Sequence, residues 1–142
     1  MKEPVERIMW KISKMSQSIL QDRLSHLDID RSFYPLMLIE AGNGITQQEL
    51  AQKLSCDKVQ VVRIINYLSV NGYVLRIQNQ TDKRKYELTI SEKAKVFLPD
   101  IKKAFNEMSD ISLKYLSDNQ KSELYNMLII MEKNLLSHKS KL

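Results

Sequence analysis

The sequence has little of several features that define other classes of protein. Its 142 residues include one cysteine, Cys56, so no intrachain disulfide can form. The two histidines, His26 and His138, lie far apart and beside no cysteine, so the usual spacing of a zinc site is missing. We expect neither a metal nor a cofactor. Only three glycines and three prolines occur, which leaves room for long uninterrupted helices.

Long apolar runs are missing as well. No stretch has the length of a transmembrane helix, and the first residues, Met-Lys-Glu-Pro-Val-Glu, are polar, unlike a secretory leader. We therefore expect no membrane association and a cytoplasmic location. The sequence also shows no nucleophile–base pair, metal constellation or phosphate-binding loop, so we expect no enzyme.

The composition is that of an ordinary globular protein, with 43% hydrophobic and 27% charged residues. The net charge is +5 and the isoelectric point about 9.3. This balance favours an anionic partner, such as nucleic acid, a membrane surface or an acidic protein. The same charge can also serve only to keep a small protein soluble.

The N-terminal third of the sequence predicts two helices. Apolar residues recur every three or four positions over residues 5–24, which indicates one apolar helical stripe starting after Pro4. A second helix is predicted from Ser32 to Ala41, capped by either Asp30 or Ser32. Gly42-Asn43-Gly44 suits a left-handed helix end.

The middle of the sequence predicts a helix-turn-helix over residues 46–71. Thr46 and Glu49 have the spacing of a capping box, and Asp57 and Gln60 repeat that pattern after the tight turn Ser55-Cys56-Asp57. Each cap opens a short helix with apolar residues on one side, and Asn71-Gly72 closes the second one.

A β-hairpin is predicted directly after these helices, over residues 73–90. Residues 73–77 and 85–90 are rich in β-formers, and in the second segment Tyr86, Leu88 and Ile90 alternate with polar residues. The polar residues 78–84 between the segments suit a hairpin tip. A hairpin placed after a helix-turn-helix is a wing.

The C-terminal third predicts more helix. Ser91 caps a helix that Pro99 kinks or interrupts, and Ser117 with Gln120 forms a capping box for the last helix. We expect fraying from Ser137 to Leu142. The last helix presents an apolar stripe made of Leu124, Met127, Leu128, Met131 and Leu135.

These elements predict a mainly α fold with a small β-hairpin wing. We expect an N-terminal dimerisation helix in residues 1–30, a winged helix-turn-helix in residues 31–98, and C-terminal dimerisation helices in residues 99–142. Residues 31–98 are called the winged lobe below. The long apolar stripes at both ends favour a homodimer; alternatively, both stripes pack within one subunit.

The second helix of the pair is the expected recognition helix, because the DNA major groove admits one α-helix. Arg63 can bond guanine, Gln60 can bond adenine, and Lys58 can hold a phosphate. Apolar side chains can contact thymine methyl groups. An ordinary solvated helix face is the alternative. The outward positions are Lys58, Val59, Gln60, Val62, Arg63 and Asn66.

The predicted wing carries the second group of candidate DNA contacts. Its cations are Arg76, Lys83, Arg84 and Lys85. Such a basic finger can follow the phosphate backbone or place an arginine in a narrow minor groove, and Arg84 is our candidate for that insertion. We expect Asp82 to orient Arg84 through an ion pair. Alternatively, the hairpin is charged only for solubility.

Several of these stretches together resemble the MarR family (multiple antibiotic resistance regulators). The resemblance runs without gaps from Ile45 to Lys95. The family patterns are roughly L-T-x-x-E-L-A, K-G-L-V-x-R, D-x-R and L-T-E-K-G. They match Ile45-Thr46-Gln47-Gln48-Glu49-Leu50-Ala51, Asn71-Gly72-Tyr73-Val74-Leu75-Arg76, Asp82-Lys83-Arg84 and Ile90-Ser91-Glu92-Lys93-Ala94. Val59 and Val62 depart from the Ser or Thr often found there.

The resemblance implies a homodimeric, sequence-specific transcriptional regulator of double-stranded DNA. Such proteins usually repress from pseudo-palindromic operators and are released by a small-molecule effector or by oxidation. Cys56 lies in the turn before the recognition helix, where oxidation would disturb that helix, but we favour the alternative that it fills a small apolar position. A regulator without a sensor and a winged-helix protein–protein adaptor without DNA binding also fit the sequence. The resemblance places any ligand between the dimerisation helices and the winged lobe. Met9, Trp10, His26, Phe33 and Tyr34 can line that region, but aromatic and Met residues at helical spacing more often form core, so we assign no ligand site.

Overall fold

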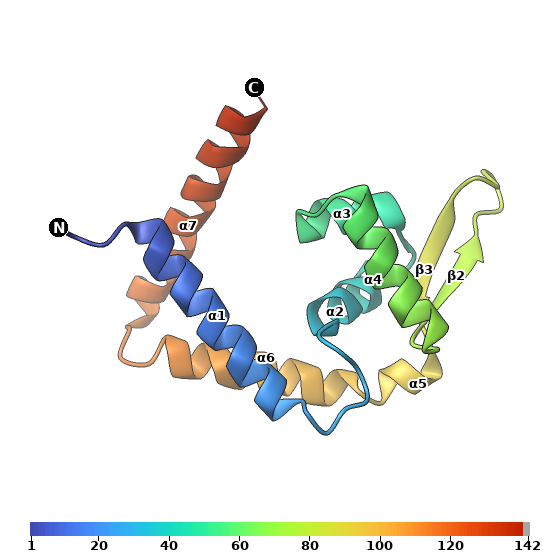
Figure 1. The fold of residues 1–142 in the computed structure, drawn as a ribbon, viewed down its shortest axis with the longest axis horizontal. Helices are drawn as coiled ribbons and strands as arrows, with labels where there is room; N and C mark the ends of the chain where they lie inside the picture. Colours follow the sequence, from blue (N-terminus) through green and yellow to red (C-terminus); the bar gives the residue numbers. More distant parts are fainter. Residues whose placement is uncertain (141–142) are drawn as a thin grey trace. The chain divides into compact units, whose positions relative to one another are not determined.

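The computed structural model describes residues 1–140 of the chain as helices α1–α7 and three short strands, β1–β3 (Figure 1). Contacts divide the chain into two compact units, residues 1–106 and the residues from Glu107 on. Helices α1 to α5 and the sheet belong to the first unit, and α6 crosses from the first into the second.

Helix α1, Val5–Arg23, begins after Pro4 as the sequence predicts. Its apolar stripe is present, and Leu20 is the one residue of α1 that is buried within residues 1–140. The exposed apolar side chains are Val5, Ile8, Met9, Trp10, Ile12 and Met15. The stripe is therefore a surface of this chain and not part of its core.

Helix α2, Phe33–Gly42, has Ser32 and not Asp30 at its N-cap. Pro35 falls in the first turn, where its missing N–H removes no helical hydrogen bond. The helix ends as predicted, with Asn43 at φ 42° and Gly44 at φ 102°. This left-handed ending turns the chain into a short strand that the sequence pattern does not predict, β1, Ile45–Thr46.

Helices α3, Gln47–Leu54, and α4, Lys58–Val70, form the predicted helix-turn-helix. The backbone N–H of Glu49 donates to Thr46 Oγ1 at 3.2 Å, as in a capping box. The return bond differs from the predicted one, because Thr46 Oγ1 donates to Glu49 Oε1 at 3.0 Å. Asp57 Oδ1 caps α4 by accepting from the backbone N–H of Gln60 at 2.8 Å.

Strands β2, Val74–Gln78, and β3, Tyr86–Ile90, form the predicted hairpin. They pair antiparallel from Val74 opposite Ile90 to Gln78 opposite Tyr86. Strand β1 pairs with the other edge of β3, so the sheet has the order β1-β3-β2. The wing is thus anchored by a third strand, and its tip projects beyond the helices of the winged lobe (Figure 1).

The core of the winged lobe lies between α2, α3, α4 and the sheet. Leu36, Leu50 and Ile65 from the three helices are fully buried, and Leu88 of β3 is almost so. On α4 the predicted inward residues are buried, except Ile64, which is half-buried. Since these side chains cover one another, the position of α4 is fixed by a core that the lobe supplies itself.

The chain continues through α5, Glu92–Lys95, into α6, Leu98–Ser112. The break falls just before Pro99, which lies in the first turn of α6, so the predicted interruption by proline is confirmed. Ser91 caps α5 by accepting at Oγ from the backbone N–H of Ala94 at 3.2 Å.

Helix α7, Asp118–Lys139, begins with both bonds of the predicted capping box between Ser117 and Gln120. It has no buried residue, and Met127, Leu128 and Leu135 of its predicted stripe are exposed. The prediction of fraying from Ser137 is wrong up to Lys139, because the helix continues that far; residues 141–142 lie outside the described part. Through residue 140, none of the helices combines the length and hydropathy that a membrane span requires.

Candidate nucleic-acid interface

The outward side of α4 carries every recognition-helix residue that the sequence predicts. All six are exposed: Lys58, Val59, Gln60, Val62, Arg63 and Asn66. Val61 and Ile65, on the opposite side of the same helix, are buried. The predicted division of α4 into a packed face and a solvent face is therefore present, and no polar residue of the outward set is used in the core.

The turn before α4 is held by backbone hydrogen bonds at the end of α3. Ser55 adopts a left-handed φ of 51°. Its N–H donates to the carbonyl of Gln52, and the N–H of Cys56 donates to the carbonyl of Ala51, both at 3.1 Å. This paired ending fixes where α4 starts. Cys56 is a half-buried free thiol within the turn.

The other end of α4 sets the position of the wing. Gly72, at φ 78°, donates its N–H to the carbonyl of Ser69 at 3.0 Å, and Tyr73 donates to the carbonyl of Leu68 at 2.8 Å. These two bonds form a Schellman ending, in which the left-handed position favours glycine. Strand β2 begins one residue after Tyr73, so the wing leaves α4 in a fixed direction.

A side-chain hydrogen bond joins the wing to α4. Arg76 Nη2 on β2 donates to Asn66 Oδ1 on α4. Both residues are predicted DNA contacts, but the sequence does not predict their pairing. The two lie ten residues apart with a helix end between them, so no local pattern signals the contact. The bond makes Arg76 and Asn66 residues that hold the wing against α4.

The wing tip is organised by Asn79. Its Oδ1 accepts from the backbone N–H of Thr81 at 2.8 Å, from the hydroxyl of Thr81 at 2.7 Å and from the N–H of Asp82 at 3.0 Å. The backbone N–H of Asn79 donates to the carbonyl of Lys85 at 2.9 Å across the hairpin. The tip is therefore a defined turn, and not merely a polar linker.

Asp82 and Arg84 form the predicted ion pair. Asp82 Oδ1 accepts from Arg84 Nε at 3.3 Å and from the backbone N–H of Arg84 at 3.1 Å. The Arg84 side chain is 92% exposed, so one carboxylate oxygen orients the start of the guanidinium while its end stays open to solvent. Within residues 1–140, four of the predicted DNA-contacting cations make neither a side-chain ion pair nor a side-chain hydrogen bond: Lys58, Arg63, Lys83 and Lys85.

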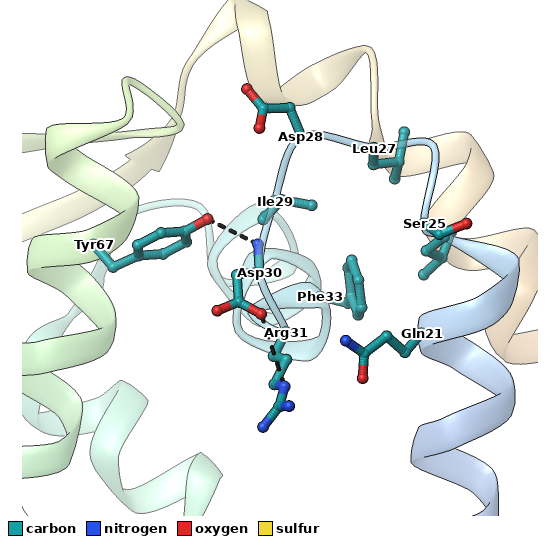
Figure 2. A pocket seen from close by; sticks show the side chains of 10 residues that line it. Gln21, Ser25, Leu27, Asp28, Ile29, Asp30, Arg31, Phe33 and Tyr67 are labelled. Atoms are coloured by element: carbon teal, nitrogen blue, oxygen red, sulfur yellow. Dashed lines mark hydrogen bonds and ion pairs between the residues drawn. The ribbon is translucent and has the colours of Figure 1, made fainter.

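A shallow pocket of about 320 Å³ lies beside the C-terminal half of α4 (Figure 2). It is lined by Gln21, Leu24, Ser25, Leu27, Asp28, Ile29, Asp30, Arg31, Phe33 and Tyr67. Most of these belong to the linker between α1 and α2, which we call the α1–α2 linker, residues 24–32. Tyr67 reaches it from α4, and its hydroxyl accepts from the backbone N–H of Asp30 at 2.8 Å.

Tyr73 makes a second bond to the same linker. Its hydroxyl donates to the carbonyl of Asp28, and its ring packs at 5.5 Å from the ring of Phe97. Burial raises the pKa of Tyr73 above 10.0, with the negative charge of Asp28 and the neighbouring Tyr67 adding to the rise. Two tyrosines at the end of α4 thus tie the α1–α2 linker to the winged lobe.

Of the five residues predicted near a ligand, Phe33 lines this pocket and the others lie elsewhere. Trp10 is exposed on α1 between the cations of Arg7 and Lys14. His26 Nε2 pairs with Asp100 Oδ2 at 3.0 Å, and Tyr34 packs 6.1 Å from Phe105. Met9 is exposed on α1. These residues therefore form no common site within the described chain.

Comparison with known proteins decides the family. The MarR family model matches residues 31–86, which span α2 to the start of β3. A MarR transcriptional regulator from Methanosarcina mazei Go1 is 31% identical, with a TM-score of 0.82 over 96% of this chain and 99% of that one. The chain belongs to the MarR family. The resemblance seen in the sequence is confirmed, and so is the winged helix-turn-helix fold.

Two further relatives illustrate the family. The transcriptional regulator BilQ of Clostridioides difficile is 27% identical over 100 residues, covering 70% of this chain and 68% of its own length. A Listeria monocytogenes protein assigned to the MarR family was solved in complex with 26-mer DNA. It has a TM-score of 0.88 at 22% identity, over 96% of this chain and 92% of that one. MarR-family proteins are transcriptional regulators, so this chain is a regulator and not an enzyme.

Proposed function

We propose that this MarR-family chain is a sequence-specific repressor that binds a pseudo-palindromic DNA operator as a homodimer and is released by a small-molecule effector. The observation that carries the DNA-binding part is the geometry of one surface. The outward side of α4 and the exposed Arg84 belong to one winged lobe, and the bond from Arg76 to Asn66 joins the wing to α4. Lys58, Arg63, Lys83 and Lys85 make neither a side-chain ion pair nor a side-chain hydrogen bond within residues 1–140, so these cations are available to phosphates.

The homodimer is supported by the apolar surfaces of the terminal helices. Helix α1 exposes most of its stripe, and α7 exposes large apolar side chains along its length. Exposed apolar stripes of this length mark interaction surfaces. A two-fold dimer would place two recognition helices on two half-sites, which doubles the contacts of one winged lobe.

Release by an effector is supported by the pocket at the α1–α2 linker. Its wall includes Tyr67, which belongs to the same helix as the outward residues Val59 and Arg63. A molecule that displaces the hydrogen bond from the Asp30 N–H to the Tyr67 hydroxyl would therefore act on the recognition helix itself. Ligand-induced thermal shifts, compared between the wild type and Tyr67→Phe, test this part separately.

DNA binding is tested with the DNA upstream of the gene and a scrambled duplex, each titrated across a salt series. We expect tight, sequence-preferring binding whose affinity falls steeply with salt. Arg84→Ala should weaken it and lower the salt slope by about one phosphate contact per wing. Lys121→Ala, an exposed lysine on α7, is the matched control and should leave both unchanged.

Asp82→Asn refines the same experiment. The substitution removes the charge that orients Arg84 but keeps an oxygen that can accept its hydrogen bonds, so we expect a smaller loss of affinity than for Arg84→Ala. No binding to any duplex at any salt would rule out the DNA-binding proposal and favour the protein–protein adaptor. Equal, weak binding to both duplexes would require selection of the operator from random DNA.

A further inference from the structure

Two of the five outward residues in the N-terminal half of α4 are apolar, Val59 and Val62. Val59 and Val62 lie three residues apart, and Arg63 follows four residues after Val59, so the three side chains share one stripe. Val59 is 69% exposed and Val62 is 36% exposed. Neither belongs to the buried core, and burial within the described chain does not account for an apolar residue at Val59, which is mostly exposed.

The polar end of the same stripe is already occupied. Asn66 lies four residues after Val62, and its Oδ1 accepts the hydrogen bond from Arg76 of the wing. Among the side chains of the stripe, the Oδ1 of Asn66 is already used, whereas Val59, Val62 and Arg63 make no side-chain hydrogen bond or ion pair within residues 1–140. They lie in the first two turns of α4, the part of a recognition helix that contacts base edges.

Only one base offers an apolar group in the major groove, because thymine carries a C5 methyl there. The other base edges present hydrogen-bond donors and acceptors. A valine placed against these polar groups would remove water from them without replacing its hydrogen bonds, which is unfavourable. The same valine against thymine buries a methyl group, which is favourable. An apolar contact therefore discriminates between bases without any hydrogen bond.

The spacing of the stripe is of the same order as the spacing of neighbouring base pairs. Three helical residues rise about 4.5 Å along the axis of α4. Successive bases of one strand lie about 3.4 Å apart along the duplex. Arg63, one residue beyond Val62, has the donor geometry that suits guanine O6 and N7. Lys58 and the cations of the wing supply the positive charge that would hold this apolar stripe in an anionic groove.

We propose that Val59 and Val62 are specificity-determining residues that read the methyl groups of thymines on neighbouring base pairs, beside a guanine read by Arg63. The proposal rests on the proposed function and extends it to the chemistry of the operator. Each half-site then contains two thymines whose C5 methyl groups contribute to the affinity. The contribution of these methyl groups is independent of salt, unlike that of the phosphate contacts.

The experiment begins with selection of a binding sequence from random duplexes by the full-length wild type. Each thymine of the selected half-site is then replaced by deoxyuridine, which keeps the base pair and removes only the methyl group. For two thymines we expect about a fourfold loss of affinity each, the equivalent of roughly 0.8 kcal/mol per methyl-sized group. Replacement of the same thymine in both half-sites of a symmetric operator should lower the affinity about sixteenfold.

Alanine variants of the two valines test which thymine methyl group each valine contacts. Val59→Ala should weaken binding to the thymine duplex without changing the salt slope, and uracil at its own position should then cost nothing more. Val62→Ala should behave in the same way at the neighbouring position. Val70→Ala is the matched control, because Val70 is 85% exposed on the same helix but at its far end. It should leave affinity and the uracil effect unchanged.

The outcomes separate this inference from the proposed function. Selective, salt-dependent binding with no loss on uracil substitution overturns the methyl readout and leaves the regulator intact. The methyl readout is likewise overturned if Val59→Ala and Val62→Ala weaken the thymine and uracil duplexes equally. Failure of the selection to enrich any sequence overturns the DNA-binding proposal, and the methyl readout with it.

Discussion

The winged lobe and the terminal helices carry the same kind of apolar pattern, but the structure uses it differently. In the lobe, Leu36, Leu50 and Ile65 are fully buried against one another and the sheet. On α1 the apolar stripe buries Leu20 alone, and α7 buries none of its residues. Spacing of three and four residues indicates which face of a helix requires cover. It does not indicate whether that cover comes from the same chain.

The winged lobe and the terminal helices therefore differ in how much stabilisation they gain from burying apolar side chains within one chain. Burying an apolar side chain contributes about 1.5–3 kcal/mol relative to leaving it exposed. The lobe gains this stabilisation from its own residues. The stripes of α1 and α7 gain little of it within one chain, and most helical stability in proteins comes from packing of an amphipathic face. The comparison therefore identifies the stripes of α1 and α7 as the surfaces that the second copy of the proposed homodimer would cover.

The largest expected effect comes from placing a charge in the stripe of α1. Ile12→Glu puts a carboxylate into the apolar surface that we propose to be buried between subunits, and an unpaired buried charge is strongly unfavourable. We expect the dimer to dissociate into monomers, measured by sedimentation. Operator affinity should fall by about 10³-fold or more, toward non-specific binding.

Ser13→Glu is the control for that variant. It adds the same charge one residue along, off the apolar stripe, and should leave the dimer and its DNA affinity intact. If Ile12→Glu stays dimeric at the same concentrations, α1 does not form the interface. A dimer would then not explain why the stripe of α1 is exposed while the apolar residues of the lobe are buried.

Truncation of one side chain in each region sharpens the comparison. In the Ile12→Glu background, Ile65→Ala should lower the free energy of unfolding by about 2–5 kcal/mol, because it leaves a cavity in the core of the lobe. Leu135→Ala, on the exposed face of α7, should change it by less than about 0.5 kcal/mol. Chemical denaturation measures both. Comparable losses would show that α7 packs within its own chain.

Much of this fold could be predicted from the sequence, because many helix starts and ends depend on residues that are close together in the chain. Thr46, Asp57 and Ser117 signal helix starts within three residues, and Gly72 signals a helix end. Strand β1 was missed since its two residues become a strand only by pairing with β3, about forty residues further on. No short sequence motif predicts that β1 pairs with β3.

The features of the candidate site divide in the same way, into those set by nearby residues and those set by contacts between distant segments. The exposure of Val59, Arg63 and Arg84 follows from periodicity and hairpin geometry, and the short-range pair of Asp82 and Arg84 could be predicted from spacing. The bond from Arg76 to Asn66 could not. Nor could the bonds from Tyr67 and Tyr73 to the α1–α2 linker, because they depend on how distant segments meet.

Tyr73 tests the junction between α1 and the lobe. Tyr73→Phe removes the hydroxyl that donates to Asp28 and should lower the free energy of unfolding by about 1–2 kcal/mol near neutral pH. Tyr125→Phe on α7, where the ring is 67% exposed, should cost far less. Equal costs would show that the buried hydroxyl adds nothing to the junction.

The pH dependence gives that prediction a second readout. The folded state raises the pKa of Tyr73 above 10.0, because burial disfavours the phenolate. The unfolded chain therefore loses this proton first, and the stabilisation linked to it is complete below pH 10 and declines as the pH rises through the folded pKa. The stability difference between the wild type and Tyr73→Phe should narrow above pH 10. A difference that stays constant would contradict the raised pKa.

The smallest expected effect concerns the partner bond at the same junction. Tyr67→Phe removes the acceptor for the backbone N–H of Asp30, and water can replace it because Asp30 is exposed, so the loss should be about 0.5–1 kcal/mol. Hydrogen exchange at the Asp30 amide is the sharper measurement and should accelerate. Tyr34→Phe, which alters a ring packed on Phe105, should leave that amide unchanged. Unaltered exchange in Tyr67→Phe would mean that the Tyr67 hydroxyl does not hold the α1–α2 linker against α4.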